Sequence, residues 1–259
     1  MYDIVLRSLR NGMEMEDCTV ILPTYNEADN IGKMVSSLRA LYPRCGILVM
    51  DDRSEDGTDE IVRGMMADDP LLGLVVRDPS DKGLSASVMD GISKVETKYF
   101  INMDSDFQHP PEALAGIHSE LGKGADLCVG VRKDRTSLSS FGRWVGSWGA
   151  QFLAALTLRL NGKPVSRDIM SGLFGGKTAV YSKVVEEHGH AFERKGFKIL
   201  FDLMKHGPAD AKVSESVFEF GERAGGESKI SGRVVLSILN QCDGWGRFVA
   251  KLAKPFLKA

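Results

Sequence analysis

Short apolar runs alternate with segments of helical spacing through the first half of this 259-residue chain. Runs of about five residues without polar alternation are typical of parallel strands that are buried on both faces. Because the segments between them have the length of crossover helices, the sequence predicts an α/β fold with a mostly parallel, Rossmann-like sheet flanked by helices. The expected strands are Cys18–Leu22, Gly46–Met50, Leu72–Val76, Tyr99–Met103 and Leu127–Val131, and the expected helices are Glu27–Leu41, Asp56–Met66, Gly83–Lys94 and Pro110–Leu121.

The second half of the chain has a mainly helical pattern. We expect helices at Phe141–Leu160, Thr178–Glu187, Arg194–His206 and Ser231–Lys258, a loop through Arg167–Gly176 and a strand at Lys212–Phe220. No segment has the composition of a linker. We therefore predict an N-terminal extension at 1–17, one continuous domain at 18–230 and a C-terminal basic amphipathic helical segment at 231–259.

Composition argues against several classes of protein. A formal net charge of -2 disfavours a generic nucleic-acid-binding protein. The longest apolar stretch, about Phe152 to Leu158, is far shorter than the ~20 residues of a membrane span, and residues 1–17 lack the apolar core of a signal peptide. Four widely spaced cysteines without a C-x-x-C pair predict reduced, buried thiols in a cytosolic protein.

The near-neutral total conceals a charge asymmetry. Phe141–Arg167 carries a net charge of +4 and Lys229–Ala259 one of +5. Because the whole chain carries -2, the remaining residues carry -11. Two basic segments on an acidic body indicate that an anionic molecule is bound at one place.

A motif with two carboxylates follows the fourth expected strand. Asp104 and Asp106 are two residues apart, and the amide of Gln108 follows two residues later. This arrangement of oxygen ligands can hold one hard divalent cation, for which a nucleotide diphosphate is the natural counter-ligand. The alternative is an Asp-rich turn that caps the following helix.

Polar residues also follow the first, second and third expected strands, at what should be the same sheet edge. Tyr25 could stack on a base, Asp52 could accept a hydrogen bond from a base or a ribose hydroxyl, and Lys82 could neutralise a phosphate. The alternatives are helix caps at Asn26 or Ser54 and a turn at Asp56-Gly57.

With these motifs in this order, the chain resembles a family 2 glycosyltransferase with the GT-A fold. Within that family it is most similar to dolichol-phosphate mannose synthases and related polyprenyl-phosphate glycosyltransferases, over about Thr19 to Ser231. The motifs behind the resemblance are Pro23–Glu27, Asp51–Thr58, Asp104–Asp106, Gln108–Glu112, Gly130–Arg132, Arg167–Gly172, Glu222-Arg223 and Gly226–Lys229.

The resemblance implies roles for individual residues. A Mg or Mn ion would be held by Asp104, Asp106 and Gln108, and the two aspartates would be catalytic. The acceptor phosphate would meet Arg132, Arg143, Arg167 and Ser171. The donor-binding residues would be Pro23, Tyr25, Glu27, Met50, Asp52, Lys82, Asp104, Ser105, Asp106, Arg132, Arg223 and Lys229.

The implied activity is inverting transfer of a sugar, best matched by mannose from GDP-mannose, to a polyprenyl or dolichyl phosphate. A phosphate monoester has a second pKa near ~6 and needs no general base, whereas a sugar hydroxyl does. The chain lacks the Gln-x-x-Arg-Trp signature of many polysaccharide-forming relatives, which favours a phosphate acceptor. It also departs from its relatives: Trp148 stands where they often have arginine, and Arg53 where they usually have glycine.

Three alternatives remain open. The enzyme could use UDP-glucose as a dolichol-phosphate glucose synthase, or transfer a sugar to a hydroxyl acceptor. The chain could instead be a non-catalytic nucleotide-sugar-binding subunit.

The acceptor lipid implies a membrane surface as a partner. In the expected long helix, apolar residues recur every four positions, at Trp144, Trp148, Phe152, Leu156 and Leu160. The C-terminal segment mixes aromatic and basic residues in the pattern of an interfacial helix. We expect a peripheral protein on the cytoplasmic face of a membrane, with a membrane-anchoring subunit as a possible partner. The alternative is an ordinary core-facing stripe.

Overall fold

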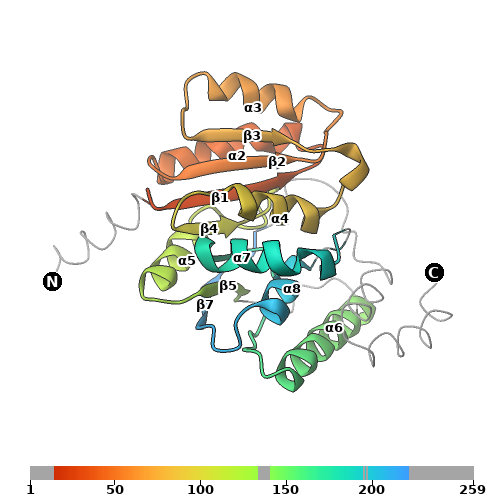
Figure 1. Ribbon diagram of the computed structural model, residues 1–259. Coiled ribbons are helices and arrows are strands. Elements are labelled where there is room, and N and C mark those ends of the chain that lie inside the picture. Colours follow the sequence, from red (N-terminus) through yellow and green to blue (C-terminus); the bar gives the residue numbers. More distant parts are fainter. Residues whose placement is uncertain (1–14, 134–140, 195, 197, 222–259) are drawn as a thin grey trace.

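A seven-stranded mixed sheet forms the centre of the protein (Figure 1). The computed structural model describes residues 15–133, 141–194, 196 and 198–221. The strand order is β3-β2-β1-β4-β6-β5-β7, and β6 runs antiparallel to both of its neighbours while the other pairs are parallel. The strands are β1 Cys18–Thr24, β2 Gly46–Asp51, β3 Leu72–Val76, β4 Tyr99–Asn102, β5 Leu127–Arg132, β6 Phe174–Lys177 and β7 Val213–Phe218.

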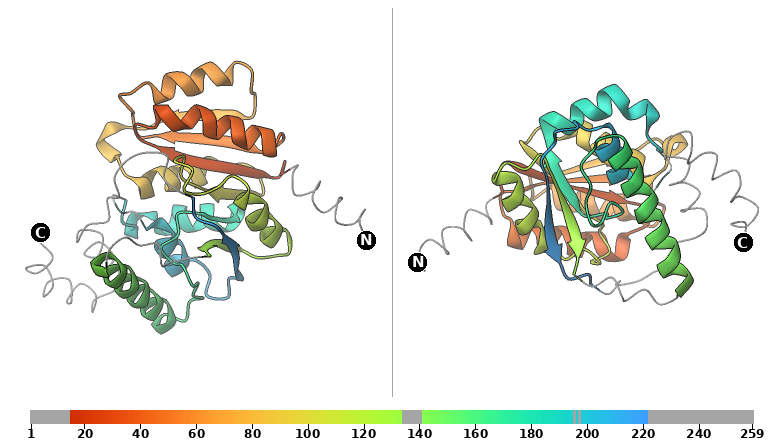
Figure 2. Two further views of the ribbon diagram at one scale, coloured as in Figure 1. Left: turned by 180° about the vertical axis from the view of Figure 1, so that it is seen from behind. Right: turned by 90° about the horizontal axis from the view of Figure 1, so that it is seen from below.

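Helices cover both faces of this sheet, as the sequence predicts (Figures 1 and 2). On one face α4 packs against α7 and α8, with α6 beside α8; on the other, α2 packs against α3, and α5 covers the strands from β4 to β7. The helices are α2 Ala28–Leu41, α3 Thr58–Met66, α4 Leu84–Lys94, α5 Ala113–Gly122, α6 Phe141–Leu160, α7 Thr178–His188 and α8 Ile199–His206, with 3-10 turns η1 Pro79–Asp81 and η2 Gly189–Ala191.

Two hydrophobic cores result from the alternation of side chains along the strands. In β1, Ile21 lies in the core beneath α4 and α7, whereas Val20 and Leu22 lie in the core beneath α2 and α5. All three side chains are fully buried. The absence of polar alternation in the sequence is therefore explained, because both faces of the central strands are covered.

Strand β6 corrects the sequence prediction, which placed Arg167–Gly176 in a loop. Its sequence, Phe-Gly-Gly-Lys, has no β-branched residue and two glycines, so no strand signal exists. The glycines have a packing role: a Cβ on Gly175 would lie 2.8 Å from the Phe100 carbonyl oxygen, and one on Gly176 would lie 2.8 Å from the Tyr181 ring. Only glycine permits this close approach of backbone and neighbouring side chains.

A second correction concerns the helix expected at Arg194–His206, which begins only at Ile199. The preceding residues point their carbonyl groups at α4 instead. The Arg194 carbonyl accepts a hydrogen bond from the Ala86 N–H at 3.1 Å, and the Gly196 carbonyl accepts one from the Ser85 hydroxyl at 2.8 Å. These tertiary bonds hold the segment away from helical geometry.

The parallel strands place their carboxyl ends at one edge of the sheet. Since β6 is antiparallel, it starts at that same edge, with Phe174 opposite Asn102 of β4. Polar residues that are far apart in the sequence are thereby brought to one edge, which is where α/β proteins bind their ligands. Among the described residues, no helix has the length and apolarity needed to cross a bilayer.

Candidate active site

The Asp104–Gln108 motif forms a tight turn directly after β4. The Asp106 carboxylate accepts a hydrogen bond from the Gln108 N–H at 3.1 Å, and Phe107 adopts a left-handed backbone conformation with φ of 63°. The Asp104 N–H donates to Nδ1 of His109 at 3.1 Å. Asp104 is partly exposed and Asp106 is only 6% exposed, so one carboxylate faces outward while the other is held in the turn.

Gly172, in the loop before β6, packs directly against this turn. A Cβ at this position would lie 3.0 Å from the His109 ring and 3.1 Å from an Asp104 carboxylate oxygen. The Gly172 carbonyl accepts a hydrogen bond from the Asn102 side chain at 2.7 Å, which fixes the loop at the end of β4. The missing side chain therefore allows the loop to approach the Asp104 carboxylate closely.

The turn fits a divalent cation that arrives with a phosphate ligand. Asp104, Asp106 and Gln108 supply only hard oxygen ligands, which suit Mg or Mn. No group of three or more His, Cys, Asp or Glu residues gathers as a metal site within the described part of the chain. Since Mg²⁺ commonly takes one or two carboxylates and completes its shell with water and substrate phosphates, two carboxylates and one amide are adequate.

Tyr25 and Lys82 meet at the ends of β1 and of the loop after β3. The ammonium group of Lys82 lies 4.4 Å from the centroid of the Tyr25 ring, a cation–π contact, and Tyr25 is 46% exposed. The Lys82 ammonium group also approaches the Arg53 carbonyl at 3.5 Å. An exposed aromatic ring next to a cation is suited to a nucleoside with its phosphates.

Asp52 has protein partners that the sequence could not show. Its carboxylate accepts hydrogen bonds from the Ser87 hydroxyl at 2.7 Å and from the Gly83 N–H at 2.9 Å, and it pairs with the buried Arg77 guanidinium. Asp52 is 7% exposed. In this structure its contacts hold the start of α4, while the predicted contact with the nucleoside stays a prediction.

The remaining predicted donor residues lie in different surroundings. Glu27 occupies the N-cap position of α2 without a side-chain capping bond, and its carboxylate accepts a hydrogen bond from the Asn30 side chain at 2.9 Å. Pro23, Met50 and Ser105 are buried, and Met50 is part of the core with no exposed surface, so its side chain does not face this edge of the sheet. Arg223 and Lys229 lie outside the described residues.

The predicted acceptor residues divide into two groups. Arg132, at the end of β5, donates to the fully buried Asp168 carboxylate at 3.1 Å, and the nearby Ser171 hydroxyl donates to the Leu173 carbonyl at 3.1 Å. Arg167 instead points to β7, where its backbone and side chain both bond the Glu215 carboxylate. Arg143 lies in the first turn of α6.

Gln151 of α6 fixes the loop that carries Asp168. Its amide donates to the Ser166 carbonyl at 3.1 Å and accepts from the Ile169 N–H at 3.0 Å. Through Gln151, α6 therefore positions the loop that carries Asp168.

Sequence reasoning missed Lys198, which precedes α8. Its ammonium group donates to the Met170 carbonyl at 3.2 Å. The charges of Asp168, Arg132 and Asp104 influence its pKa. Nothing in the sequence pattern separates it from a surface lysine of the expected helix. Only the late start of α8 places it here.

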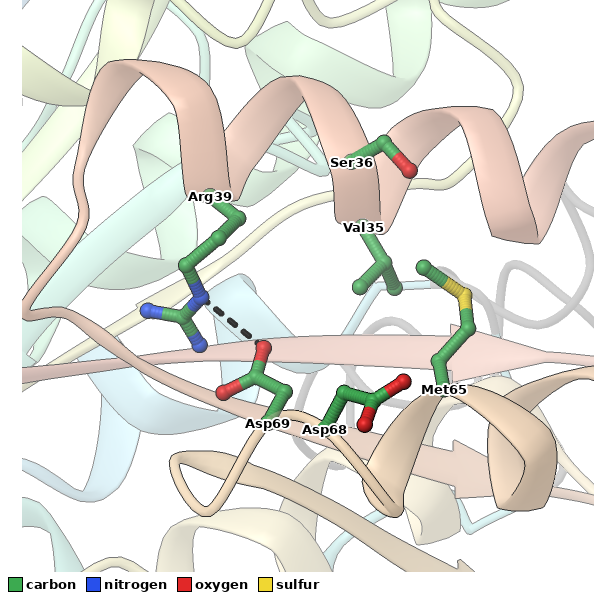
Figure 3. A pocket seen from close by; sticks show the side chains of 6 residues that line it. All are labelled: Val35, Ser36, Arg39, Met65, Asp68 and Asp69. Carbon is green, nitrogen blue, oxygen red and sulfur yellow. Dashed lines mark hydrogen bonds and ion pairs between the residues drawn. The ribbon is translucent and has the colours of Figure 1, made fainter.

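A pocket of about 380 Å³ lies elsewhere, between α2 and the end of α3 (Figure 3). Arg39 in its wall bonds the Asp69 carboxylate at 2.8 Å and the Pro43 and Cys45 carbonyls, so it closes the turn after α2. None of the strand-end residues described above lines this pocket.

Comparisons with known proteins show the family of this chain. The model of the family Glycosyl transferase family 2 matches residues 19–185. Dolichol-phosphate mannosyltransferase of Pyrococcus furiosus is 34% identical over 229 residues, covering 85% of this chain and 61% of that protein, so the chain spans less than two thirds of this relative. The enzyme of the same name from Saccharomyces cerevisiae is 30% identical and covers 86% of this chain and 84% of the relative.

Solved structures with low sequence identity share the fold. Mannosyl-3-phosphoglycerate synthase of Rubrobacter xylanophilus is 17% identical with a TM-score of 0.61, covering 98% of this chain and 78% of that chain. Glucosyl-3-phosphoglycerate synthase of Mycobacterium tuberculosis, in complex with Mn2+, UDP-glucose and phosphoglyceric acid, is 17% identical with a TM-score of 0.63, covering 89% and 82%.

Proposed function

This chain belongs to glycosyl transferase family 2 and is therefore a glycosyltransferase, and we propose that it transfers mannose from GDP-mannose to a polyprenyl phosphate such as dolichyl phosphate. Relatives named dolichol-phosphate mannosyltransferase, aligned over most of the chain, support the sugar and the lipid class. The observation that carries the proposal is the Asp104–Gln108 turn at the end of β4 with the Arg132–Asp168 pair beside it.

The residues at the sheet edge suggest how the donor lies. Tyr25 and Lys82, after β1 and β3, would receive the base and a phosphate, and the diphosphate would extend to Asp104 and Asp106 after β4. A Mg or Mn ion held by Asp104, Asp106 and Gln108 would neutralise the departing nucleoside diphosphate. The sugar would then lie beyond β4, on the side of β6 and β5.

The surroundings of His109 support a phosphate acceptor over a hydroxyl acceptor. This histidine is 4% exposed, its Nδ1 accepts the Asp104 N–H, and the rings of Phe218 and Phe220 pack on it. It is therefore not placed to remove a proton from a substrate. A phosphate dianion needs no base: one of its oxygens forms the bond to C1 while the bond from C1 to the nucleoside diphosphate breaks, and that electron pair leaves with the diphosphate.

A transfer assay with purified protein tests this proposal. The protein is incubated with radiolabelled GDP-mannose or UDP-glucose, with dolichyl phosphate or free dolichol, and with Mg²⁺ or Mn²⁺. We expect labelled lipid only from GDP-mannose with dolichyl phosphate, and release of the β-linked product confirms inversion. Product from UDP-glucose would change the donor, product on free dolichol would overturn the phosphate acceptor, and donor binding without product would indicate a non-catalytic subunit.

We further propose that the enzyme works at the cytoplasmic surface of a membrane, with the outer face of α6 against the lipid. Phe152 and Leu160 are 62% and 69% exposed, Leu156 lies between them on the same face, and Arg159 beside them is exposed. An exposed apolar stripe with a cation at its edge suits an anionic bilayer. The three described cysteines are buried free thiols, which fits a reducing compartment. The basic segment at 231–259 lies outside the described residues.

Exchanging both exposed side chains for serine (Phe152→Ser with Leu160→Ser) is expected to weaken binding to anionic liposomes by about tenfold or more, because their transfer into the bilayer contributes more than about 1.4 kcal/mol. Co-sedimentation with liposomes measures this. Leu71→Ser is the matched control, since Leu71 is 45% exposed on the opposite edge of the sheet. Equal binding of all three proteins would contradict the orientation, and binding that requires a second protein would point to a membrane-anchoring subunit.

A further inference from the structure

Lys198 lies close to the candidate active site without belonging to any motif there. Its side chain is partly buried, and its ammonium group donates to the Met170 carbonyl at 3.2 Å. This bond uses one of three N–H groups of the ammonium ion. The remaining donors can serve a ligand.

A five-residue loop connects Lys198 to the other charged groups. The Asp168 carboxylate pairs with Arg132, the Met170 carbonyl accepts from Lys198, and Gly172 lies against the Asp104 carboxylate. The loop from 168 to 172 therefore brings two cations and the predicted metal ligand to one place. Arg132 is 25% exposed and keeps N–H groups beyond the one that bonds Asp168, and it is near enough to Lys198 for its charge to lower the pKa of Lys198.

The electrostatic surroundings of Lys198 favour an anion next to it. Burial lowers the pKa of Lys198, the Asp168 carboxylate raises it, Arg132 lowers it and Asp104 raises it, with a net lowering. Burial is the largest of these effects, and the Asp168 carboxylate, which opposes it, already pairs with Arg132. A partly buried ammonium ion whose charged form is disfavoured by burial gains from a further anionic partner.

The segment before Lys198 is fixed to the donor side of the site. Arg194 bonds the carboxylates of Asp81 and Asp90, and its carbonyl accepts from the α4 N–H of Ala86. The carbonyl of Gly196 accepts from Ser85 of the same helix. Lys198 is therefore held in place by the helix whose first turn adjoins Lys82.

Topology decides which phosphate would lie against Lys198. The residues predicted to bind the nucleoside follow β1, β2 and β3, on one side of β4. Arg132 and the loop from 168 to 172 adjoin β5 and β6, on the other side. In an inverting displacement the attacking phosphate approaches the anomeric carbon from the face opposite the leaving diphosphate, so the acceptor belongs on the β5 and β6 side.

We propose that Lys198 and Arg132 jointly bind the phosphate group of the lipid acceptor, next to the sugar of the bound donor. This inference rests on the proposed function, since it assumes a phosphate acceptor. It adds to the acceptor site a lysine that no motif in the sequence identifies.

Steady-state kinetics with Lys198→Met and Lys198→Arg tests the proposal. The acceptor is a short, water-soluble polyprenyl phosphate, which removes effects of membrane binding. For Lys198→Met we expect the KM for the acceptor to rise at least tenfold and the KM for GDP-mannose to change less than twofold. Lys198→Arg should recover a large part of the acceptor affinity. Lys163→Met is the control, because the Lys163 ammonium group also bonds a backbone carbonyl, that of Gly207, at 2.7 Å.

Each other outcome has a definite meaning. A higher KM for GDP-mannose alone would assign Lys198 to the donor diphosphate and overturn the proposal, as would unchanged values for both substrates. If Lys198→Met does not fold, binding of the short polyprenyl phosphate to the wild-type protein and to Lys198→Arg is measured at several salt concentrations. The same affinity for both proteins at every salt concentration would count against a phosphate contact. Failure of the wild-type protein to glycosylate any lipid phosphate would refute the proposed function itself, and is seen before any variant is made.

Discussion

Replacing Asp106 by asparagine is expected to reduce the rate of mannosyl transfer by about 10³-fold, which corresponds to about 4 kcal/mol of transition-state stabilisation. The asparagine keeps the shape of the side chain, and its carbonyl oxygen can still accept the Gln108 N–H, so the turn after β4 persists. What is lost is one negative charge and one of the ligands that we propose for the cation on the diphosphate. Initial rates at saturating donor and acceptor measure the effect.

Metal removal and a control aspartate complete that experiment. Treatment with EDTA should abolish the activity of the wild-type protein, and added Mg²⁺ or Mn²⁺ should restore it, whereas neither ion restores Asp106→Asn. The control is Asp126→Asn, because Asp126 pairs with Lys177 just before β5, at the sheet edge away from the site. A fully active Asp106→Asn enzyme, or wild-type activity that EDTA leaves intact, would refute the metal role of this turn.

Replacing Arg77 by methionine is expected to lower the free energy of unfolding by about 3 kcal/mol, because it leaves a buried carboxylate without its cation. The Arg77 side chain is 3% exposed and pairs with Asp52, Asp81 and Asp90. Burial lowers the pKa of Arg77, but the carboxylates of Asp90 and Asp52 outweigh that effect and raise it overall. In a chain of this size the melting temperature should fall by roughly 6–12 °C.

Two further variants separate the buried pair from a general loss of charge. Arg63→Met removes an exposed pair, since Arg63 is 61% exposed and lies 3.6 Å from Asp59, and it should change the free energy of unfolding by less than about 0.5 kcal/mol. Combining Arg77→Met with Asp52→Asn should recover part of the lost stability, because the carboxylate that lacks a partner is gone. Urea denaturation measures all four proteins, and equal losses for Arg77→Met and Arg63→Met would refute the role of burial.

The importance of Arg77 shows where reasoning from sequence stops. Asp52 follows β2 as the sequence predicts, yet the cation that pairs with it directly follows β3, the hydroxyl comes from α4 and the N–H from the residue before α4. No local pattern marks these partners, since they are 25, 35 and 31 residues away. The sequence therefore predicts a ligand-binding role for Asp52, whereas in the fold its carboxylate belongs to a buried ion-pair network.

Arg167 gives a second example. In the sequence it belongs to a basic segment that favours phosphate, whereas in the structure Glu215 of β7 accepts its hydrogen bonds. Burial raises the pKa of Glu215, and the hydrogen bonds from Arg167 and Ser166 more than offset this and lower it. The parallel pairing of β5 with β7 creates this contact, and the sequence contains no signal for that pairing.

The sequence by itself determined the α/β fold, the strands from β1 to β5 and the position of Asp104, Asp106 and Gln108 after β4, because buried parallel strands and helix spacing are local patterns. Only the tertiary structure decided where β6 lies, where α8 begins and which charges meet. Gly175 and Gly176 form a strand because Phe100 and Tyr181 leave room for nothing larger, and Lys198 reaches the site because Ser85 and Ala86 bond the carbonyl groups of Gly196 and Arg194 just before it. Both depend on contacts between residues distant in the chain, and the physical reason is that close packing and burial of charge are settled by neighbours in space.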